Sequence, residues 1–285
     1  MSRIVLIALL ICNFAMAIQA KEAAVRKTEV RRTHEQLQAA LWVRTSVEYD
    51  VACVQAYALA AMRVEEALAD PSWSAAIEQT VDYHELPPAV VLDVDETVLD
   101  NSTFQVRLVS QNIDFSAKLW DQWVAEEQAV AVPGAKDFIK FLVAKKIAVL
   151  FVTNRDVSGE AATVNNLSAV LDMPVTKEQV LCKSEQADWT SDKTARRAHL
   201  AKSHRLLLLV GDDFNDFVLL GKVSPQHRVE KGKEYQQHWG KKWIQLPNPL
   251  YGHWEKSIFK YDYSMSDEQK LNIKYETLGN GSTAN

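Results

Sequence analysis

The sequence predicts an α/β fold in which a parallel sheet is flanked by helices in a Rossmann-like arrangement. Three short, almost continuous apolar runs lie at residues 89–92, 147–152 and 206–210. Such runs are typical of strands that are buried on both faces of a parallel sheet. Stretches of helical character separate them, which indicates alternating strands and helices. A polar cluster follows each run, and ligands bind beyond the carboxyl ends of such strands.

The first twenty residues predict an export signal. Arg3 precedes an apolar stretch at residues 4–11, and small residues follow at Ala17 and Ala20. A basic start, a short apolar centre and a small-residue end are typical of a secretory signal peptide. The apolar stretch is shorter than the roughly 20 residues of a membrane-spanning helix. We therefore expect residues 1–20 to be a cleaved signal and the protein to be periplasmic or secreted.

The cysteines leave two alternatives open. Cys12 ends the apolar stretch, so a membrane-attached protein lipidated at this residue is the alternative to a cleaved signal. The bulky Ile11 precedes it, where lipoprotein signals usually carry a small residue, and we favour cleavage over an outer-membrane lipoprotein. Cys53 and Cys182 then remain, and they either form a disulfide or are buried as small apolar side chains.

The composition excludes several classes of protein. Of the 285 residues, 47% are hydrophobic and 24% are charged, and the formal net charge is −5. These values exclude a mainly disordered chain and a polytopic membrane protein. The negative charge argues against binding to a nucleic-acid polymer, so an anionic partner would be a small molecule held at a local site. The sequence does not determine the oligomeric state, and a homo-oligomer is one of the alternatives.

Residues 21–86 are expected to form an N-terminal helical region that packs on the core. Residues 21–70 contain neither Gly nor Pro. Apart from the last pair, apolar residues within them recur at steps of three and four, which predicts the buried face of an amphipathic helix. Pro71 is expected to end this helix. The residues of the predicted buried face are Val47, Val51, Val54, Ala58, Ala61 and Met62.

The core is expected to span residues 87–260. A cap insertion is expected over about residues 100–135, between the first and second strands. Helices are predicted at residues 135–145 and 193–202, each between two of the strands. Residues 261–285 are expected to form a C-terminal tail.

The polar clusters after the three strands occupy residues 93–97, 153–155 and 211–216, about sixty residues apart. A single polar cluster of this kind often serves only as a loop or a helix cap. Three of them, each placed directly after a buried strand, converge at one edge of a parallel sheet. They therefore favour a functional site. Their carboxylates belong to Asp93, Asp95, Glu96, Asp212, Asp213 and Asp216.

The convergence of so many carboxylates predicts a bound cation. Like charges raise each other's pKa values and oppose folding unless a cation compensates them. Oxygen ligands suit Mg²⁺, which in turn recruits phosphate oxygens. Asp93 and Asp95 are two residues apart and point to the same side of an extended strand. One of them can attack phosphorus as a nucleophile while the other serves the leaving group.

This set of motifs resembles the haloacid dehalogenase (HAD) superfamily and, within it, the class C bacterial acid phosphatases of the lipoprotein e(P4) type. The resemblance spans about residues 30–260 and implies a Rossmann-like HAD core with small cap elements. The segments that carry it lie in the family's order at residues 86–102, 133–135, 152–155, 191–197, 210–213 and 246–255.

The resemblance implies roles for the acidic residues. Asp93 is expected to be the nucleophile that forms a phosphoaspartate. Asp95 is expected to act as the general acid and then as the base for water, and to give its backbone carbonyl to Mg²⁺. Asp93 and Asp212 are the expected side-chain ligands of the metal, with Asp216 holding metal-bound water.

The resemblance also implies the phosphate site. Thr153 and Asn154 are expected to bind the phosphate, with Lys193 as the stabilising cation and Lys183 as the alternative for that role. Arg155 is left outside the catalytic set, because it could steer phosphate or simply be solvated.

The expected substrate-binding residues are aromatic: Trp123 and Tyr251, with Phe104 as a weaker candidate. Aromatic rings at a cleft can stack on a base, although core packing is the common role of Trp. The family often takes nucleoside monophosphates. The expected function is therefore an exported, Mg²⁺-dependent acid phosphatase that hydrolyses phosphomonoesters through a phosphoaspartyl intermediate. Nucleoside monophosphates are candidate substrates. The alternatives are a phosphotransferase that uses the same intermediate and a non-catalytic surface binding protein on the same fold.

Overall fold

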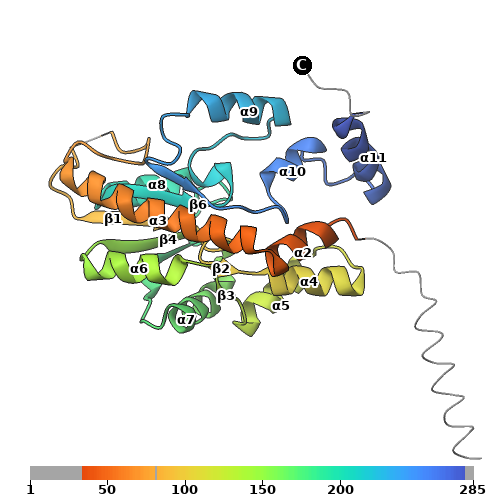
Figure 1. The fold of residues 1–285 in the computed structure, drawn as a ribbon, viewed down its shortest axis with the longest axis horizontal. Helices are drawn as coiled ribbons and strands as arrows, with labels where there is room; N and C mark the ends of the chain where they lie inside the picture. Colours follow the sequence, from red (N-terminus) through yellow and green to blue (C-terminus); the bar gives the residue numbers. More distant parts are fainter. Residues whose placement is uncertain (1–33, 81, 280–285) are drawn as a thin grey trace, which may run out of the picture.

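The computed structural model describes residues 34–80 and 82–279. The predicted signal peptide and Cys12 lie outside the described residues. Two helices begin the described chain, and the strands and helices of the core follow them (Figure 1).

A sheet of five parallel strands forms the centre of the fold, in the order β5-β4-β1-β6-β7. Its strands are β1 (Pro88–Leu92), β4 (Ala148–Asp156), β5 (Val180–Lys183), β6 (Arg205–Gly211) and β7 (Trp243–Gln245). The three predicted apolar runs form the middle of the sheet, and the predicted α/β fold class is confirmed. The edge strands β5 and β7 were not predicted, because three or four residues are too few to show a pattern.

Helices cover both faces of the sheet. Val90 and Leu92 pack into a core with the buried sides of α3 (Val47–Ala69), α6 (Ala135–Ala144) and α7 (Glu160–Leu171). Ala89 and Val91 point to the other face, where α8 (Thr194–Ala201) packs. Figure 1 shows α3 crossing in front of the sheet, with α6 and α7 below it. The alternation along β1 therefore divides the apolar side chains between two cores.

Helices α2 (Leu37–Thr45) and α3 (Val47–Ala69) form the described part of the N-terminal helical region. The predicted buried face of α3 is wrong: Val47 is 66% exposed and Met62 is 61% exposed. The opposite side carries a second stripe at the same spacing, built from small and aromatic residues, which lets α3 approach the core closely. Its buried members are Tyr49, Cys53, Tyr57, Ala60, Val64 and Ala67.

The segment between β1 and β4 leaves the sheet and returns to it. The short strands β2 (Leu99–Asp100) and β3 (Val130–Ala131) pair antiparallel at its base. Helices α4 (Ser102–Gln111) and α5 (Ala117–Glu126) lie between them, and α4 packs beside α2. This is the segment in which the sequence predicts a cap insertion.

The C-terminal part of the described chain contains α9 (Pro225–Glu234), α10 (His253–Ile258) and α11 (Asp267–Leu278). Of these, only α11 lies in residues 261–285, the expected tail, so a helix forms within that segment. Ser266 and Gln269 form a capping box at the start of α11, a sequence signal for a helix that was overlooked. Lys274 of α11 pairs with Glu255 at 2.7 Å and also with Glu35, which ties the segment to the body. The remaining single turns are η1 (Val157–Gly159), η2 (Lys177–Gln179) and η3 (Phe214–Asp216).

Cys53 and Cys182 are both buried and free in the structure, so they act as small apolar side chains and not as a disulfide. Within the described part of the chain, no helix has both the length and the apolar character that crossing a bilayer requires.

Candidate active site

Three loops at the carboxyl ends of neighbouring strands meet at one cavity. Asp93 follows β1, Asn154 lies near the end of β4, and Asp212 follows β6. Because the strands are parallel and adjacent, these residues line the same cavity of about 360 Å³. The inserted helix α5 and the segment around α10 supply its other walls. The edge of the sheet that the polar clusters predict is therefore where the cavity lies.

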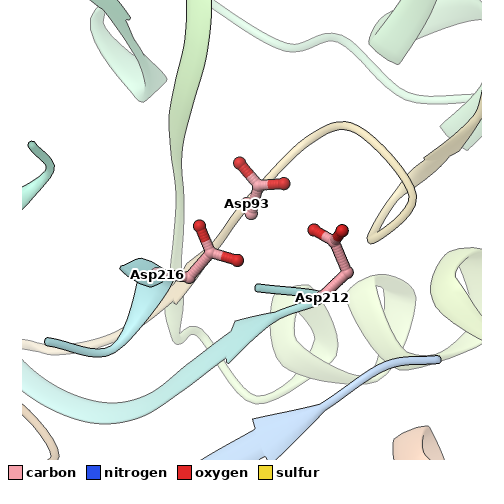
Figure 2. Close-up of side chains that lie close together, drawn as sticks. All are labelled: Asp93, Asp212 and Asp216. Carbon is pink, nitrogen blue, oxygen red and sulfur yellow. The ribbon is translucent and has the colours of Figure 1, made fainter. Parts of the chain in front are cut away.

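Three carboxylates gather at the floor of this cavity. Figure 2 shows Asp93, Asp212 and Asp216 turned toward one another. One carboxylate oxygen from each lies within 4.8 Å of the other two. Asn248 Nδ2 donates to Oδ2 of Asp212 at 2.8 Å, which fixes that carboxylate. Because every ligand atom is an oxygen, the cluster suits a hard divalent cation.

Lys193 is the cation beside this cluster. Its side chain is 4% exposed, and Nζ donates to Asp93 and, at 2.7 Å, to Oδ1 of Asp216. Lys193 directly precedes α8, and its ammonium contacts Asp93, the residue that follows β1. Lys183, the alternative for this role, is partly exposed at the end of β5 and lies 3.7 Å from Asp156 instead.

The carboxylates of the cluster carry more negative charge than the one neighbouring lysine neutralises. Burial raises the pKa of Asp93 to about 7, against the lowering effect of Lys193. Burial, with Asp216 and Asp93 nearby, raises the pKa of Asp212 well above its usual range. Burial would lower the pKa of Lys193, but the two carboxylates that it contacts outweigh burial and raise it. One lysine does not balance the charge of three carboxylates, of which Asp93 is buried and Asp212 and Asp216 are partly exposed, and a divalent cation would restore the balance.

The side chain of Asp95 lies apart from the carboxylate cluster. Its Oδ1 accepts hydrogen bonds from Arg155 and Asn101, while the residue still lines the cavity. The metal role predicted for Asp95 concerns its backbone carbonyl and stays a prediction. The side chain of Asp95 is therefore held by Arg155 and Asn101, and its proton-transfer role stays a prediction.

The two residues expected to bind phosphate differ in their access to the cavity. Asn154 lines it, and its side chain is held by Arg196 Nη2 at 2.7 Å and by the Ser191 carbonyl at 3.0 Å. Thr153 is fully buried, and its Oγ1 accepts from the backbone N–H of Arg155 at 3.0 Å. The phosphate-binding roles of Thr153 and Asn154 stay predictions.

The aromatic residues of the cavity are only partly those expected. Tyr251 lines the cavity, but Trp123 and Phe104 are 1% and 3% exposed and pack on each other behind the wall. Neither Trp123 nor Phe104 belongs to the lining, so the structure does not place them against a substrate in this cavity. The aromatic residues that do line the cavity beside Tyr251 are Phe115, Trp120, Phe259 and Tyr263.

Sequence reasoning missed two features of this site. Phe259 and Tyr263 lie in or next to the segment that was expected to be a tail, so their aromatic spacing was not weighed. Arg155 was left open as a solvated or phosphate-steering residue, but its side chain is 1% exposed and pairs with Asp95 at 2.8 Å. Its position directly after Thr153-Asn154, at the end of a central strand, is the signal that could have placed it in the site.

Comparisons with known proteins agree with this geometry. A model of the HAD superfamily, subfamily IIIB (acid phosphatase), matches residues 5–254. The structure of the class C acid phosphatase from Bacillus anthracis has a TM-score of 0.76 and 31% identity, with 88% of this chain and 98% of that chain covered. A second structure of that enzyme, with tungstate bound, gives the same TM-score and identity and covers 90% and 100%.

Two curated plant proteins are more distant relatives. The stem 28 kDa and 31 kDa glycoproteins of Glycine max are 29% and 27% identical to this chain over 166 and 165 residues. Each alignment covers 56% of this chain and 58% of the plant protein. The chain therefore matches little more than half the length of these curated relatives.

Proposed function

Because the chain belongs to subfamily IIIB of the HAD superfamily, the acid phosphatases, we propose that it hydrolyses phosphomonoesters through a phosphoaspartyl intermediate on Asp93. The observation that carries this proposal is the contact of the buried Asp93 carboxylate with Lys193 at the floor of a cavity. A nucleophilic carboxylate and a fixed positive charge are what phosphoryl transfer to a protein side chain requires.

The residues divide the reaction into two steps. In the first, an oxygen of Asp93 forms a bond to phosphorus, and the bond from phosphorus to the ester oxygen breaks. Asp95 gives its proton to the departing oxygen, and Lys193 stabilises the charge on the phosphoryl oxygens. In the second, Asp95 takes a proton from water, the water oxygen bonds to phosphorus, and the phosphoaspartate bond breaks. Phosphate leaves, and both aspartates return to their starting states.

We propose Mg²⁺ as the cofactor, held by Asp93, Asp212 and Asp216. The oxygen-only donor set and the raised pKa values of Asp93 and Asp212 support this proposal. When bound, the ion supplies positive charge that draws phosphoryl oxygens to the site. Asn248 orients Asp212 for this role through its 2.8 Å hydrogen bond, as residues behind metal ligands commonly do.

The proposed substrates carry an aromatic group, with nucleoside monophosphates as the first candidates. Trp120 and Tyr251 line the same cavity as Asp93, and aromatic side chains stack on bases. The Bacillus anthracis relative was solved with tungstate. Tungstate is a tetrahedral oxyanion like phosphate, which supports an oxyanion-binding cavity here as well.

We also propose that residues 1–20 are a signal peptide that directs export, so that the mature protein is periplasmic or secreted. The basic, apolar and small-residue order of these residues supports it. The mass of the mature protein from an expressing cell tests it. Cleavage after Ala17 or Ala20 is expected, and a mature chain that begins with a lipid-modified Cys12 would favour the alternative.

Phosphate release by the protein without residues 1–20 tests the proposed activity. The substrates are 4-nitrophenyl phosphate and a nucleoside monophosphate, each with Mg²⁺ and with EDTA. We expect turnover that requires the metal and is lost in Asp93→Asn. Asp172→Asn is the matched control, because it removes the same charge at an exposed, left-handed helix end that Asn tolerates.

Two outcomes would redirect the proposal. Phosphate transfer to an added alcohol at the expense of phosphate release would favour a phosphotransferase. No turnover of either substrate by the folded, Mg²⁺-supplied protein would favour a binding protein.

A further inference from the structure

Three N–H donors converge on one oxygen of Asp95. Arg155 donates to Oδ1 from Nε at 3.0 Å and from Nη2 at 2.8 Å. Asn101 Nδ2 donates to the same oxygen at 3.0 Å. Among the described residues, Oδ2 has no hydrogen-bond donor, and Asp95 lines the cavity that holds Asp93. The carboxylate therefore has one oxygen fixed by the protein and one oxygen free.

A buried tryptophan fixes the orientation of Asn101. Trp123 Nε1 donates to Asn101 Oδ1 at 2.8 Å, and Arg155 Nη2 donates to that oxygen at 3.3 Å. An indole N–H can only donate, so it selects the amide orientation in which Nδ2 points to Asp95. Trp123, Asn101 and Arg155 are all buried, each with at most 2% of its surface exposed. The three side chains form a rigid, buried network behind Asp95.

Arg155 suits this network for reasons of geometry. The guanidinium presents several donors in one plane, whereas a lysine ammonium is a flexible point charge. Its Nη1 donates to Thr163 Oγ1 at 3.3 Å, and the Trp120 ring lies 5.6 Å from its central carbon. These contacts fix the plane of the guanidinium, and its position fixes the rotation of the Asp95 carboxylate.

We infer that Arg155, Asn101 and Trp123 are positioning residues that direct Oδ2 of Asp95 to the leaving oxygen of the substrate. This inference rests on the proposed function and deepens it. As the ester bond breaks, the proton on Oδ2 passes to the departing oxygen, while Oδ1 keeps its three donors. A carboxylate free to rotate would spend part of its time with neither oxygen in line for this transfer.

The dependence of activity on the leaving group tests the inference. Phenyl phosphate and 4-nitrophenyl phosphate have similar shapes, but the phenolate is more basic and depends more on a proton from the enzyme. We expect Arg155→Lys to lower kcat/KM for phenyl phosphate by about tenfold more than for 4-nitrophenyl phosphate, within the usual contribution of a general acid. Trp123→Phe, which removes only the indole N–H and keeps the ring, is expected to shift the same ratio by a smaller factor.

Two controls separate positioning from general damage. Arg205→Lys replaces another buried arginine, which lies at the opposite end of β6 and bonds the Asp70 carbonyl. It is expected to leave the ratio unchanged even if it lowers the melting temperature. In an Asp95→Asn background, Arg155→Lys is expected to cause no further change in the ratio.

Equal losses on both substrates in Arg155→Lys would overturn the inference. The failure of the proposed function looks different, because the unmodified protein would then hydrolyse neither substrate. If Asp95→Asn changes the ratio and neither Arg155→Lys nor Trp123→Phe does, the proposed function stands and the positioning role is wrong.

Discussion

A β-carbon on Gly211 would lie 2.5 Å from Cβ of Asp216, closer than two unbonded carbons can approach. Gly211 ends β6, and Asp216 belongs to the turn that brings the chain back over the strand. Only a residue without a side chain permits this close approach. The position of the third carboxylate of the cluster therefore depends on a glycine that does not itself line the cavity.

Gly211→Ala is expected to displace Asp216 from Lys193 and from the metal ligands. We expect Mg²⁺ affinity to fall about 10- to 100-fold, as when other supports of metal ligands are lost. Titration of activity with Mg²⁺ measures this change. Gly232→Ala is the control, because its β-carbon meets nothing closer than 3.8 Å. Equal Mg²⁺ affinity in the two variants would contradict the account.

Removal of one carboxylate should have opposite effects with and without metal. In EDTA, we expect Asp212→Asn to unfold at the same temperature as the parent or at a higher one. The substitution removes the charge repulsion between Asp212 and its neighbours Asp93 and Asp216. Mg²⁺ should stabilise the parent by about 2.7 kcal/mol at one hundred times its Kd, and Asp212→Asn much less. Thermal unfolding with and without Mg²⁺ measures both effects. If Asp212→Asn is less stable than the parent in EDTA and is stabilised by Mg²⁺ as much as the parent is, the assignment of Asp212 as a metal ligand is wrong.

The hydroxyl of Tyr57 links helix α3 to Thr97, in the loop that follows β1. It donates to the Thr97 carbonyl at 2.5 Å, and both residues are buried. Tyr57→Phe leaves this carbonyl without its partner and is expected to lower the free energy of unfolding by about 1–3 kcal/mol. Chemical denaturation measures the loss. Tyr275→Phe removes an exposed hydroxyl and should change little; equal effects from the two variants would contradict the structural role.

His238 makes the stability of the fold depend on pH. Its ring stacks on Trp243 at 4.5 Å, and burial, with a smaller effect of Lys242, lowers its pKa. The unfolded chain therefore binds the proton more readily than the folded one. Stability should fall as the pH drops below the ordinary histidine pKa of about 6.5, and the loss should be complete below the lowered pKa of the folded state.

The variant His238→Phe keeps the stacking and removes the charge. We expect a smaller difference in its free energy of unfolding between pH 7 and pH 5 than in the parent. Denaturant unfolding at both pH values measures it, with the exposed His84→Phe as the control. An unchanged pH dependence in His238→Phe would rule out this contribution.

The sequence predicts the middle of the fold well and its margins poorly. Central strands such as Leu206–Val210 are buried on both faces, so their apolar character is continuous and easy to see. Helix α3 carries two apolar stripes, and periodicity alone favours the more aliphatic one at Val47 and Met62, although Tyr49 and Tyr57 face the core. Polar atoms made the tyrosines look less buried than they are.

The residues of the site that follow the central strands were also predicted better than those on the surrounding helices. The expected positions of Asp93, Asp212 and Lys193 depend on strand ends and motif order, and the structure brings all three together. The role of Trp123 depends on which side of α5 meets the cavity, and that is set by packing between helices. The structure turns its N–H to Asn101 instead.

The central claim is that a covalent phosphoryl group forms on Asp93. The most direct test mixes the protein with Mg²⁺ and excess substrate, stops the reaction with acid within its first turnovers, and maps the added phosphoryl group by peptide mass. The account predicts one phosphoryl group on the peptide that contains Asp93, and none in Asp93→Asn. Rapid release of phosphate with no phosphoryl group on any peptide of the stopped protein would contradict it.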